Sequence, residues 1–229
     1  MFVTLALTMM LMSADANARL RDALQTEERG NDTAALSAFD ALIRENQTWE
    51  LPRLEAARLR LKTGQRVELA ERDADIARSL APENPRAHYL FALAADDQGH
   101  RSEARHALET ALTLRPDYGE AQNRLAGLLS AEGQFAAAAR VYKSYLAGHP
   151  ADVGSNVQWA LALERSGSVA QAEAALRSLA SKMPSSRLVA LRTLAAMLER
   201  QGRPQDAQQV RTSLEPPVKK MRELNRSSH

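Results

Sequence analysis

Residues 85–118, PRAHYLFALAADDQGHRSEARHALETALTLRPDY, contain three markers that recur along the chain at one spacing. The markers are a glycine, an alanine five residues later and a proline near the end of the stretch. Each returns after 34 or 35 residues: Gly99, Gly133, Gly167 and Gly202; Ala104, Ala138, Ala172 and Ala207; Pro82, Pro116, Pro150 and Pro184. Three markers that share one period indicate a repeat protein.

Each marker has a structural role. Glycine adopts the positive φ that closes a helix, and the small alanine lets the next helix approach the preceding one closely. Proline lacks a backbone N–H and restricts the residue before it, so it ends the second helix. The repeated unit is therefore predicted to be a helical hairpin, and the fold to be all-α.

The composition supports helix and excludes several kinds of function. Alanine supplies 42 of the 229 residues and is the strongest helix former. Lys and Arg total 30 against 28 Asp and Glu, so the net charge of +2 gives no reason to expect polyanion binding. The sequence has no cysteine, which excludes disulfides, thiolate metal sites, a cysteine nucleophile and lipid attachment through cysteine.

With these markers the chain resembles the tetratricopeptide repeat (TPR) family, whose unit is a helix–turn–helix of 34 residues. In residues 85–118 the family pattern falls on Phe91, Ala92, Gly99, Ala104, Ala111 and Pro116. The resemblance implies an all-α fold, an α-solenoid of about six TPR hairpins with a short C-terminal capping helix. The predicted solenoid covers 17–216, with repeats at about 16–49, 51–84, 85–118, 119–152, 153–186 and 188–216.

The first two repeats depart from the pattern. Gly64 comes one residue early, and Gln47 stands where the first repeat would have its proline. In later repeats the aromatic residue of the family's fourth position is replaced by His88, Gln122 and Asn156.

Residues 1–16 resemble an export signal. An apolar run at 2–12 is followed by two small-residue cleavage patterns, Ala14-Asp15-Ala16 as the better match and Ala16-Asn17-Ala18 as the second. No basic residue precedes Arg19. We favour a cleaved signal and hence a periplasmic or secreted protein, with a cytoplasmic location as the alternative. Two other interpretations stay open: an apolar cap packed over the first repeat, and a mis-assigned start or uncleaved anchor.

Residues 217–229 form a basic segment, with Lys219, Lys220, Arg222 and Arg226 against Glu223. A segment of this kind can bind an acidic surface, lipid headgroups or nucleic acid. We favour the other interpretation, a solvated cap over the last repeat, because terminal repeats need a polar outer face.

The sequence offers no chemistry for catalysis. The five histidines form no HExxH motif and no zinc-type cluster, so we interpret them as solvated. No glycine-rich phosphate loop and no GxSxG elbow is present. Trp159 falls on a buried leucine position of the family and is predicted to pack in the core. We therefore predict no enzyme activity, no cofactor and no metal site.

The resemblance also implies a concave groove lined by the first helix of each hairpin. On this chain the predicted partner-binding residues are Arg86, Tyr89, Leu93, Asn123, Gly127, Val157, Leu161 and Arg192. The lysine and asparagine clamp of chaperone-binding TPRs is absent, since Asn123 lacks its companions. The mixture of apolar and charged residues suits an amphipathic helix or an extended peptide.

Two smaller features have a simple structural explanation as well as a functional one. Gly127 lies within a predicted helix, where glycine costs about 0.5–1 kcal/mol relative to alanine. It either lets a ligand backbone come close or is merely tolerated. The basic residues between 53 and 66 are interpreted as a solvated face rather than an RNA-binding face, because no matched polar position recurs in each repeat.

Together these features predict a non-catalytic TPR scaffold that binds a peptide or helix of a partner protein. The expected setting is assembly of a bacterial envelope system, such as a pilus, secretion, cytochrome maturation or polysaccharide export. The alternative is a cytosolic TPR adaptor or regulator. No nucleic acid partner is expected, and membrane contact is expected only through an uncleaved leader.

Overall fold

The computed structural model describes residues 2–214, with side chains from residue 14 onward. Every regular element within residues 2–214 is a helix, and consecutive helices pack against each other from α1 to α6 and again from α8 to α12. The predicted all-α repeat fold is therefore confirmed. The basic segment predicted to form a C-terminal cap, 217–229, lies outside the described residues.

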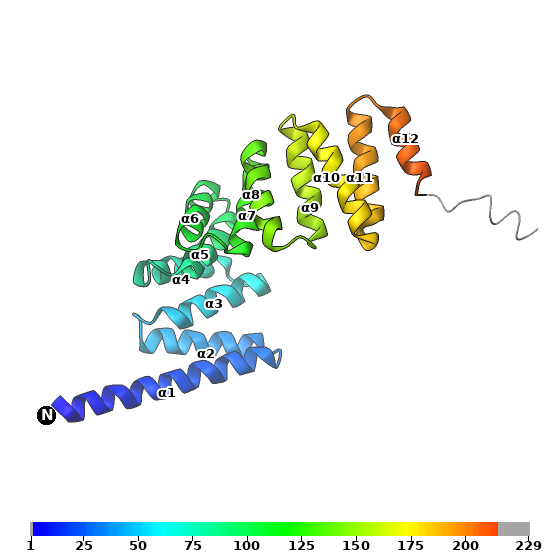
Figure 1. Ribbon diagram of the computed structural model, residues 1–229. Coiled ribbons are helices and arrows are strands. Elements are labelled where there is room, and N and C mark those ends of the chain that lie inside the picture. The colour runs from blue at the N-terminus through cyan, green and yellow to red at the C-terminus, as the bar shows by residue number, and fades with distance from the viewer. Residues whose placement is uncertain (1, 215–229) are drawn as a thin grey trace, which may run out of the picture. The chain divides into compact units, whose positions relative to one another are not determined.

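The helices pair into six successive hairpins (Figure 1). Their bounds are α1 (Phe2–Glu28) with α2 (Asp32–Glu45), α3 (Glu50–Thr63) with α4 (Val67–Leu80), α5 (Pro85–Asp97) with α6 (Arg101–Leu114), α7 (Gly119–Ala131) with α8 (Phe135–Gly148), α9 (Val153–Arg165) with α10 (Val169–Lys182), and α11 (Arg187–Arg200) with α12 (Pro204–Thr212). A short 3₁₀ turn, η1 (Pro184–Ser186), precedes α11.

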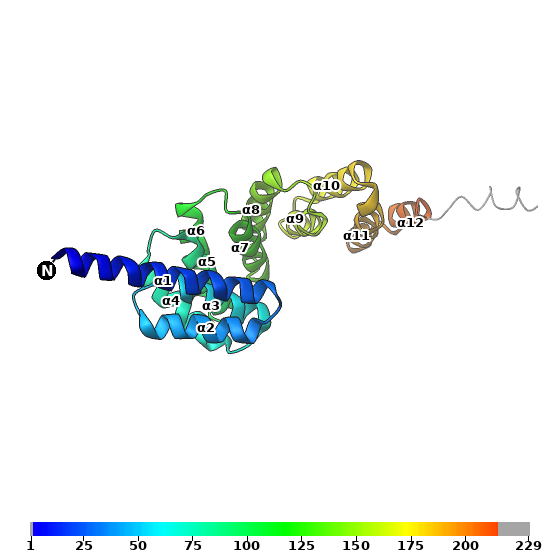
Figure 2. The same cartoon turned by 90° about the horizontal axis from the view of Figure 1, so that it is seen from below.

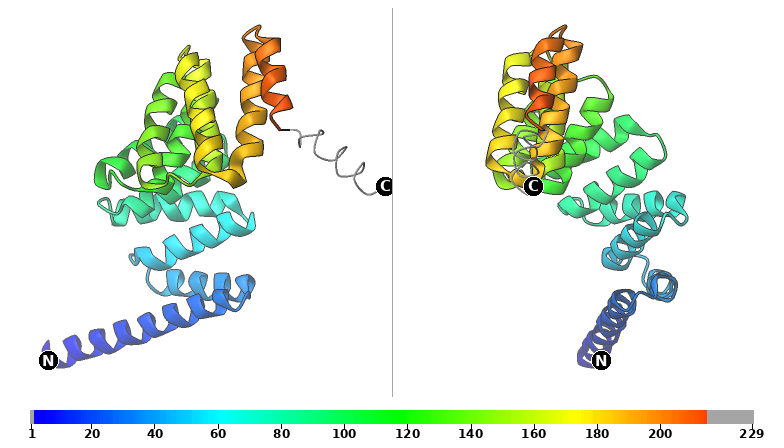
Figure 3. Two further views of the ribbon diagram at one scale, coloured as in Figure 1. Left: turned by 45° about the vertical axis from the view of Figure 1, so that its right-hand side comes forward. Right: turned by 90° about the vertical axis from the view of Figure 1, so that its right-hand side faces the viewer.

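The chain divides into two compact units. Unit 1 extends to Ala121 and contains α1 to α6 with the first residues of α7, and unit 2 begins at Gln122. In unit 1, α1 runs along α2, and α3 packs on α2 (Figure 2). In unit 2, α9, α10, α11 and α12 pack in sequence order (Figure 3).

The core of the first hairpins is built from one apolar side of each helix. Leu20 and Ala23 of α1 pack with Phe39 and Leu42 of α2 and with Leu59 of α3. Asn31 caps α2, because its side-chain oxygen accepts a hydrogen bond from the backbone N–H of Ala34 at 3.2 Å. A hairpin alone buries only part of its apolar surface, so each one depends on its neighbour.

The alanine markers have the packing role that the sequence predicts. The side chains of Ala104, Ala138, Ala172 and Ala207 are fully buried. Each lies near the start of the second helix of its hairpin, where a larger residue would push the two helices apart.

An inserted residue explains the early glycine of the second repeat. Gly64 ends α3 in the left-handed conformation, with φ 67°, as Gly99 does after α5 with φ 84°. In the second hairpin an additional residue precedes the next helix, and Arg66 takes a left-handed φ of 53° before α4 begins. The period is therefore lengthened in the turn, and the helices keep their register.

The polar residues that replace the family's aromatic residue at the fourth position make hydrogen bonds. His88 Nε2 lies 2.8 Å from the carbonyl oxygen of Pro82, and Asn156 donates to the carbonyl oxygen of Pro150 at 3.1 Å. The two contacts are equivalent in their repeats. Each polar side chain satisfies a carbonyl of the proline-containing link that leads into its own helix.

A single helix, α1, runs through most of the predicted leader and on into the first hairpin. Among the side chains described, the first buried one is Leu20, which follows both predicted cleavage positions. The division into leader, solenoid and tail stays a prediction. Within the described part of the chain, no helix combines the length and apolar character needed to cross a membrane.

Candidate partner-binding surfaces

Three predicted partner-binding residues lie on one side of α5 in unit 1. Arg86, Tyr89 and Leu93 are three and four residues apart, which places them on one helix face, and all three are half-buried. The ring centroid of Tyr89 lies 5.1 Å from that of Tyr118. Arg86 donates to Glu55 of α3 at 2.7 Å, so a charge-assisted bond joins two successive first helices.

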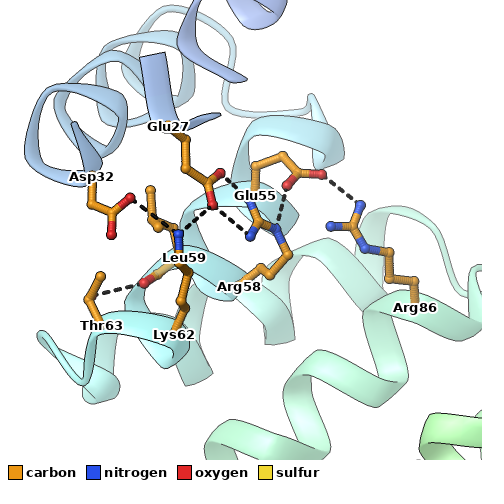
Figure 4. A network of polar contacts seen from close by, with 8 residues as sticks. All are labelled: Glu27, Asp32, Glu55, Arg58, Leu59, Lys62, Thr63 and Arg86. Atoms are coloured by element: carbon orange, nitrogen blue, oxygen red, sulfur yellow. Dashed lines mark hydrogen bonds and ion pairs between the residues drawn. The ribbon is translucent and has the colours of Figure 1, made fainter. Parts of the chain in front are cut away.

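An ionic network continues from this bond across the first helices of unit 1 (Figure 4). Arg58 donates from Nε to Glu55 at 2.8 Å and from Nη1 to Glu27 of α1 at 2.9 Å. Lys62 lies 3.2 Å from the same carboxylate of Glu27 and 3.3 Å from Asp32. Together with Arg86, these residues connect α1, α2, α3 and α5.

The network shifts the pKa of its two central acids. Hydrogen bonds from Arg58 and Lys62 hold the pKa of Glu27 below its usual value, against the opposing effect of burial. Burial raises the pKa of Glu55, but the hydrogen bonds from Arg86 and Arg58 outweigh it, and the net shift is downward. Both carboxylates therefore stay ionised and hold their basic partners in place near neutral pH.

The interpretation of residues 53–66 as a solvated basic face is wrong for two arginines. Arg53 and Arg60 are buried, and both donate to the carboxylate of Asp73 on α4, Arg53 at 3.0 Å. Arg60 also bonds Asp40 of α2. These arginines connect helices in the interior because a buried guanidinium needs a carboxylate partner.

The other five predicted residues lie on first helices of unit 2. Asn123 and Gly127 are one turn apart on α7, as are Val157 and Leu161 on α9, and Arg192 is exposed on α11. A hydrogen bond of 3.1 Å from Ser155 to Asn123 joins α7 to α9. Arg200 of α11 donates to Glu164 of α9 at 2.8 Å, so polar bonds connect these first helices as well.

Gly127 faces the second helix of its own hairpin. A Cβ atom at this position would lie 3.8 Å from the hydroxyl oxygen of Tyr142, an ordinary van der Waals distance. Alanine would fit there, and a longer side chain would have to pass this hydroxyl.

Trp159 differs from its prediction. It is half-buried rather than buried, and it lines a pocket of about 680 Å³ in unit 2. The other lining residues come from α8, the following link, α9 and α10: Lys143, Leu146, Ala147, Pro150, Ala151, Asn156, Ala175, Ser178, Leu179, Lys182 and Met183. The sequence missed this pocket because Trp159 stands at a position that is buried in the family pattern.

His100 is exposed, as expected, but it is not an isolated histidine. Its Nδ1 lies 2.9 Å from a carboxylate oxygen of Glu71 on α4, and this hydrogen bond raises the pKa of His100. Among the described residues, no group of three His, Asp or Glu side chains is arranged to hold a metal ion.

Comparison with known proteins identifies the repeat. Residues 89–153 match the tetratricopeptide repeat family model. No curated protein matches the sequence.

Many solved structures share the fold. YrrB, described as a TPR protein with an unusual peptide-binding site, has a TM-score of 0.66 and 19% identity over 76% of this chain and 88% of its own. A tetratricopeptide repeat protein from Parabacteroides merdae has a TM-score of 0.70 and 16% identity, over 88% of this chain and 80% of its own. PilW, a type IV pilus biogenesis factor, has a TM-score of 0.68 and 17% identity, over 87% of this chain and 91% of its own. Residues 89–153 thus carry the tetratricopeptide repeat signature, and the chain as a whole shares its fold with these structures.

Proposed function

We propose that the protein is a non-catalytic scaffold that binds a peptide or helix of a partner protein on its first helices. One observation carries the proposal. In both units the first helices expose part of their apolar side chains beside polar groups that are already fixed by bonds between helices, such as Arg86 to Glu55 and Asn123 to Ser155. A surface fixed in this way loses little side-chain entropy when a ligand binds.

The chemistry of this surface indicates the kind of ligand. Tyr89, Leu93, Val157 and Leu161 offer apolar contact, and Arg192 has no ion-pair partner among the described residues. An amphipathic segment that presents apolar anchors and a carboxylate would match these groups.

A cross-linking experiment tests this surface. A photo-reactive residue at Tyr89 or Leu161 is expected to capture a partner protein in the native host. The same residue at Glu109, exposed on the second helix α6, serves as the control. Equal capture at all three positions, or none at Tyr89 and Leu161, would count against the proposal.

We further propose that the scaffold serves a bacterial envelope assembly system after export. The apolar run and small-residue site of residues 1–16 support this, and removal of the leader would spare the core contacts of Leu20 and Ala23. The likeness to a type IV pilus biogenesis factor is compatible with such a role. A cytosolic TPR adaptor or regulator is the alternative.

The mass of the native protein distinguishes the two locations. An exported protein is expected to begin at Asn17 or Arg19 and to fractionate with the envelope or periplasm. A soluble cytosolic protein that retains Met1 would rule out export, and it would leave the binding surface to be tested separately.

A further inference from the structure

The pocket beside Trp159 lies away from the predicted groove. On α9, Trp159 is two residues from Val157 and two from Leu161. Side chains separated by two positions point about 160° apart around an α-helix, so Trp159 lies on nearly the opposite face from these two residues. The pocket is completed by α8 and α10, the second helices of their hairpins. It is therefore a surface of unit 2 that the first-helix proposal does not use.

The repeat structure provides an internal comparison. Two repeats earlier, the residue equivalent to Trp159 is Phe91, which is buried. The guanidinium carbon of Arg78 lies 4.0 Å from the centroid of the Phe91 ring, and Arg78 is held there by Asp75 at 2.7 Å. In unit 1 an arginine and its acid thus cover the aromatic ring.

In unit 2 this cover is missing. The residues equivalent to Asp75 and Arg78 are Lys143 and Leu146, both of which line the pocket. Leucine provides no cation to stack on the indole, and Lys143 has the opposite charge to Asp75. The face of Trp159 consequently stays open.

The charges of the pocket indicate what can fill it. Its lining contains Lys143 and Lys182 but no acidic residue. Neither lysine has an ion-pair partner among the described residues, and the same residues offer no acceptor for the indole N–H of Trp159. These three groups are donors around an apolar floor, so they suit an apolar group that carries carboxylates. The segment 217–229 is itself basic and does not match them.

We propose that this pocket is a second docking site, for an acidic segment of a partner protein. An aromatic or long aliphatic side chain of the segment packs against Trp159, in the place that Arg78 occupies over Phe91. Neighbouring Asp or Glu side chains pair with Lys143 and Lys182. Because the first-helix surface takes no part, either proposal can fail without the other.

Fluorescence of Trp159 tests the proposal on the full chain. The Trp49→Phe variant leaves Trp159 as the only tryptophan. The probe is a short synthetic peptide with one leucine and one phenylalanine among aspartates and glutamates. We expect a saturable change in Trp159 emission that weakens as salt rises, and none with a matched peptide whose acids are replaced by lysines.

Variants locate the site. The double variant Lys143→Asp and Leu146→Arg transplants the covering pair of unit 1, and we expect it to weaken binding at least about tenfold, which is about 1.4 kcal/mol. Lys182→Gln should weaken binding less. Arg211→Gln, which removes an exposed charge on α12 outside both surfaces, is the control and should leave binding unchanged. Unfolding curves confirm that each variant is folded.

Several outcomes would overturn the proposal. Equal binding of the acidic and lysine peptides would show that charge does not select the ligand. Tighter binding of laurate than of the acidic peptide would assign the pocket to a fatty acid. Emission that depends on protein concentration, or that changes when 215–229 is deleted, would assign it to a second copy or to the chain's own C-terminal segment.

Discussion

Arg66 is the only non-glycine residue with positive φ in the described part of the chain. A left-handed backbone costs an L-residue with a side chain roughly 1–2 kcal/mol. Arg66→Gly is therefore expected to raise the free energy of unfolding by about 1 kcal/mol, measured by urea denaturation. Arg72→Gly, an exposed position within α4, should instead lower it by about 1 kcal/mol. A loss of stability in both variants would contradict the explanation of the turn.

His100 predicts a pH-dependent contribution from its pair with Glu71. Because the pKa of His100 is raised in the folded state, the pair stabilises the fold fully below the unfolded pKa of about 6.5. This stabilisation is lost as the pH rises through the folded pKa. Glu71→Gln should thus reduce stability more at about pH 5.5 than at about pH 8.5. NMR should show a lower pKa for His100 in that variant.

The control for this prediction removes the titrating group. In a His100→Gln background, Glu71→Gln should change the stability by the same amount at both pH values. A pH-dependent difference that persists without His100 would assign the effect to another residue.

The sequence predicts correctly whether a residue is buried where the repeat pattern fixes its packing. The alanine markers are buried as the period requires, because a hairpin contact admits only a small side chain. The prediction failed for Trp159. Its exposure depends on the residue at one position of the preceding second helix, which is an arginine (Arg78) beside Phe91 and a leucine (Leu146) beside Trp159. The prediction also failed for Arg53 and Arg60 because their acid, Asp73, lies on another helix. Contacts of this kind have no local signal in one sequence.

Among the elements, α1 and α3 are connected by the carboxylate of Glu27. The side chain of Glu27 is 11% exposed and accepts from both Arg58 and Lys62. Glu27→Gln is expected to reduce the free energy of unfolding by about 1–2 kcal/mol, because it leaves two cations with a weaker acceptor. Urea denaturation at neutral pH measures this loss.

The effect of Glu27→Gln on stability should also depend on pH. The pKa of Glu27 is lowered in the folded state, so its contribution is present above the unfolded pKa and is lost as the pH falls through the folded pKa. The difference between wild type and Glu27→Gln should therefore shrink in acid. Glu45→Gln removes an exposed acid that pairs with Arg19, and it should change stability little. An equal loss of stability in both variants would mean that the burial of Glu27 does not strengthen its ion pairs.

The helices themselves were predictable as elements because their ends have strong local signals. Glycine turns and proline links set the bounds of α5 to α12, and the additional residue after Gly64 only lengthened one turn. The polar bonds between first helices were not predictable. Arg86 to Glu55 spans 31 residues and Ser155 to Asn123 spans 32, and neither pairing recurs at a fixed position in every repeat.

On the scale of the whole molecule, repeat architecture predicts that stability is local. Helices contact mainly their neighbours in the sequence, so a defect should open its own hairpin and those beside it first. Leu59 in unit 1 and Leu194 in unit 2 are both fully buried. Each Leu→Ala substitution should cost about 2–5 kcal/mol, and the two losses should appear in different places. By hydrogen exchange, Leu59→Ala is expected to speed exchange in α2 to α4, and Leu194→Ala in α9 to α12. If either variant sped exchange equally in both units, the chain would unfold as one cooperative block, and the description of separately stabilised hairpins would be wrong.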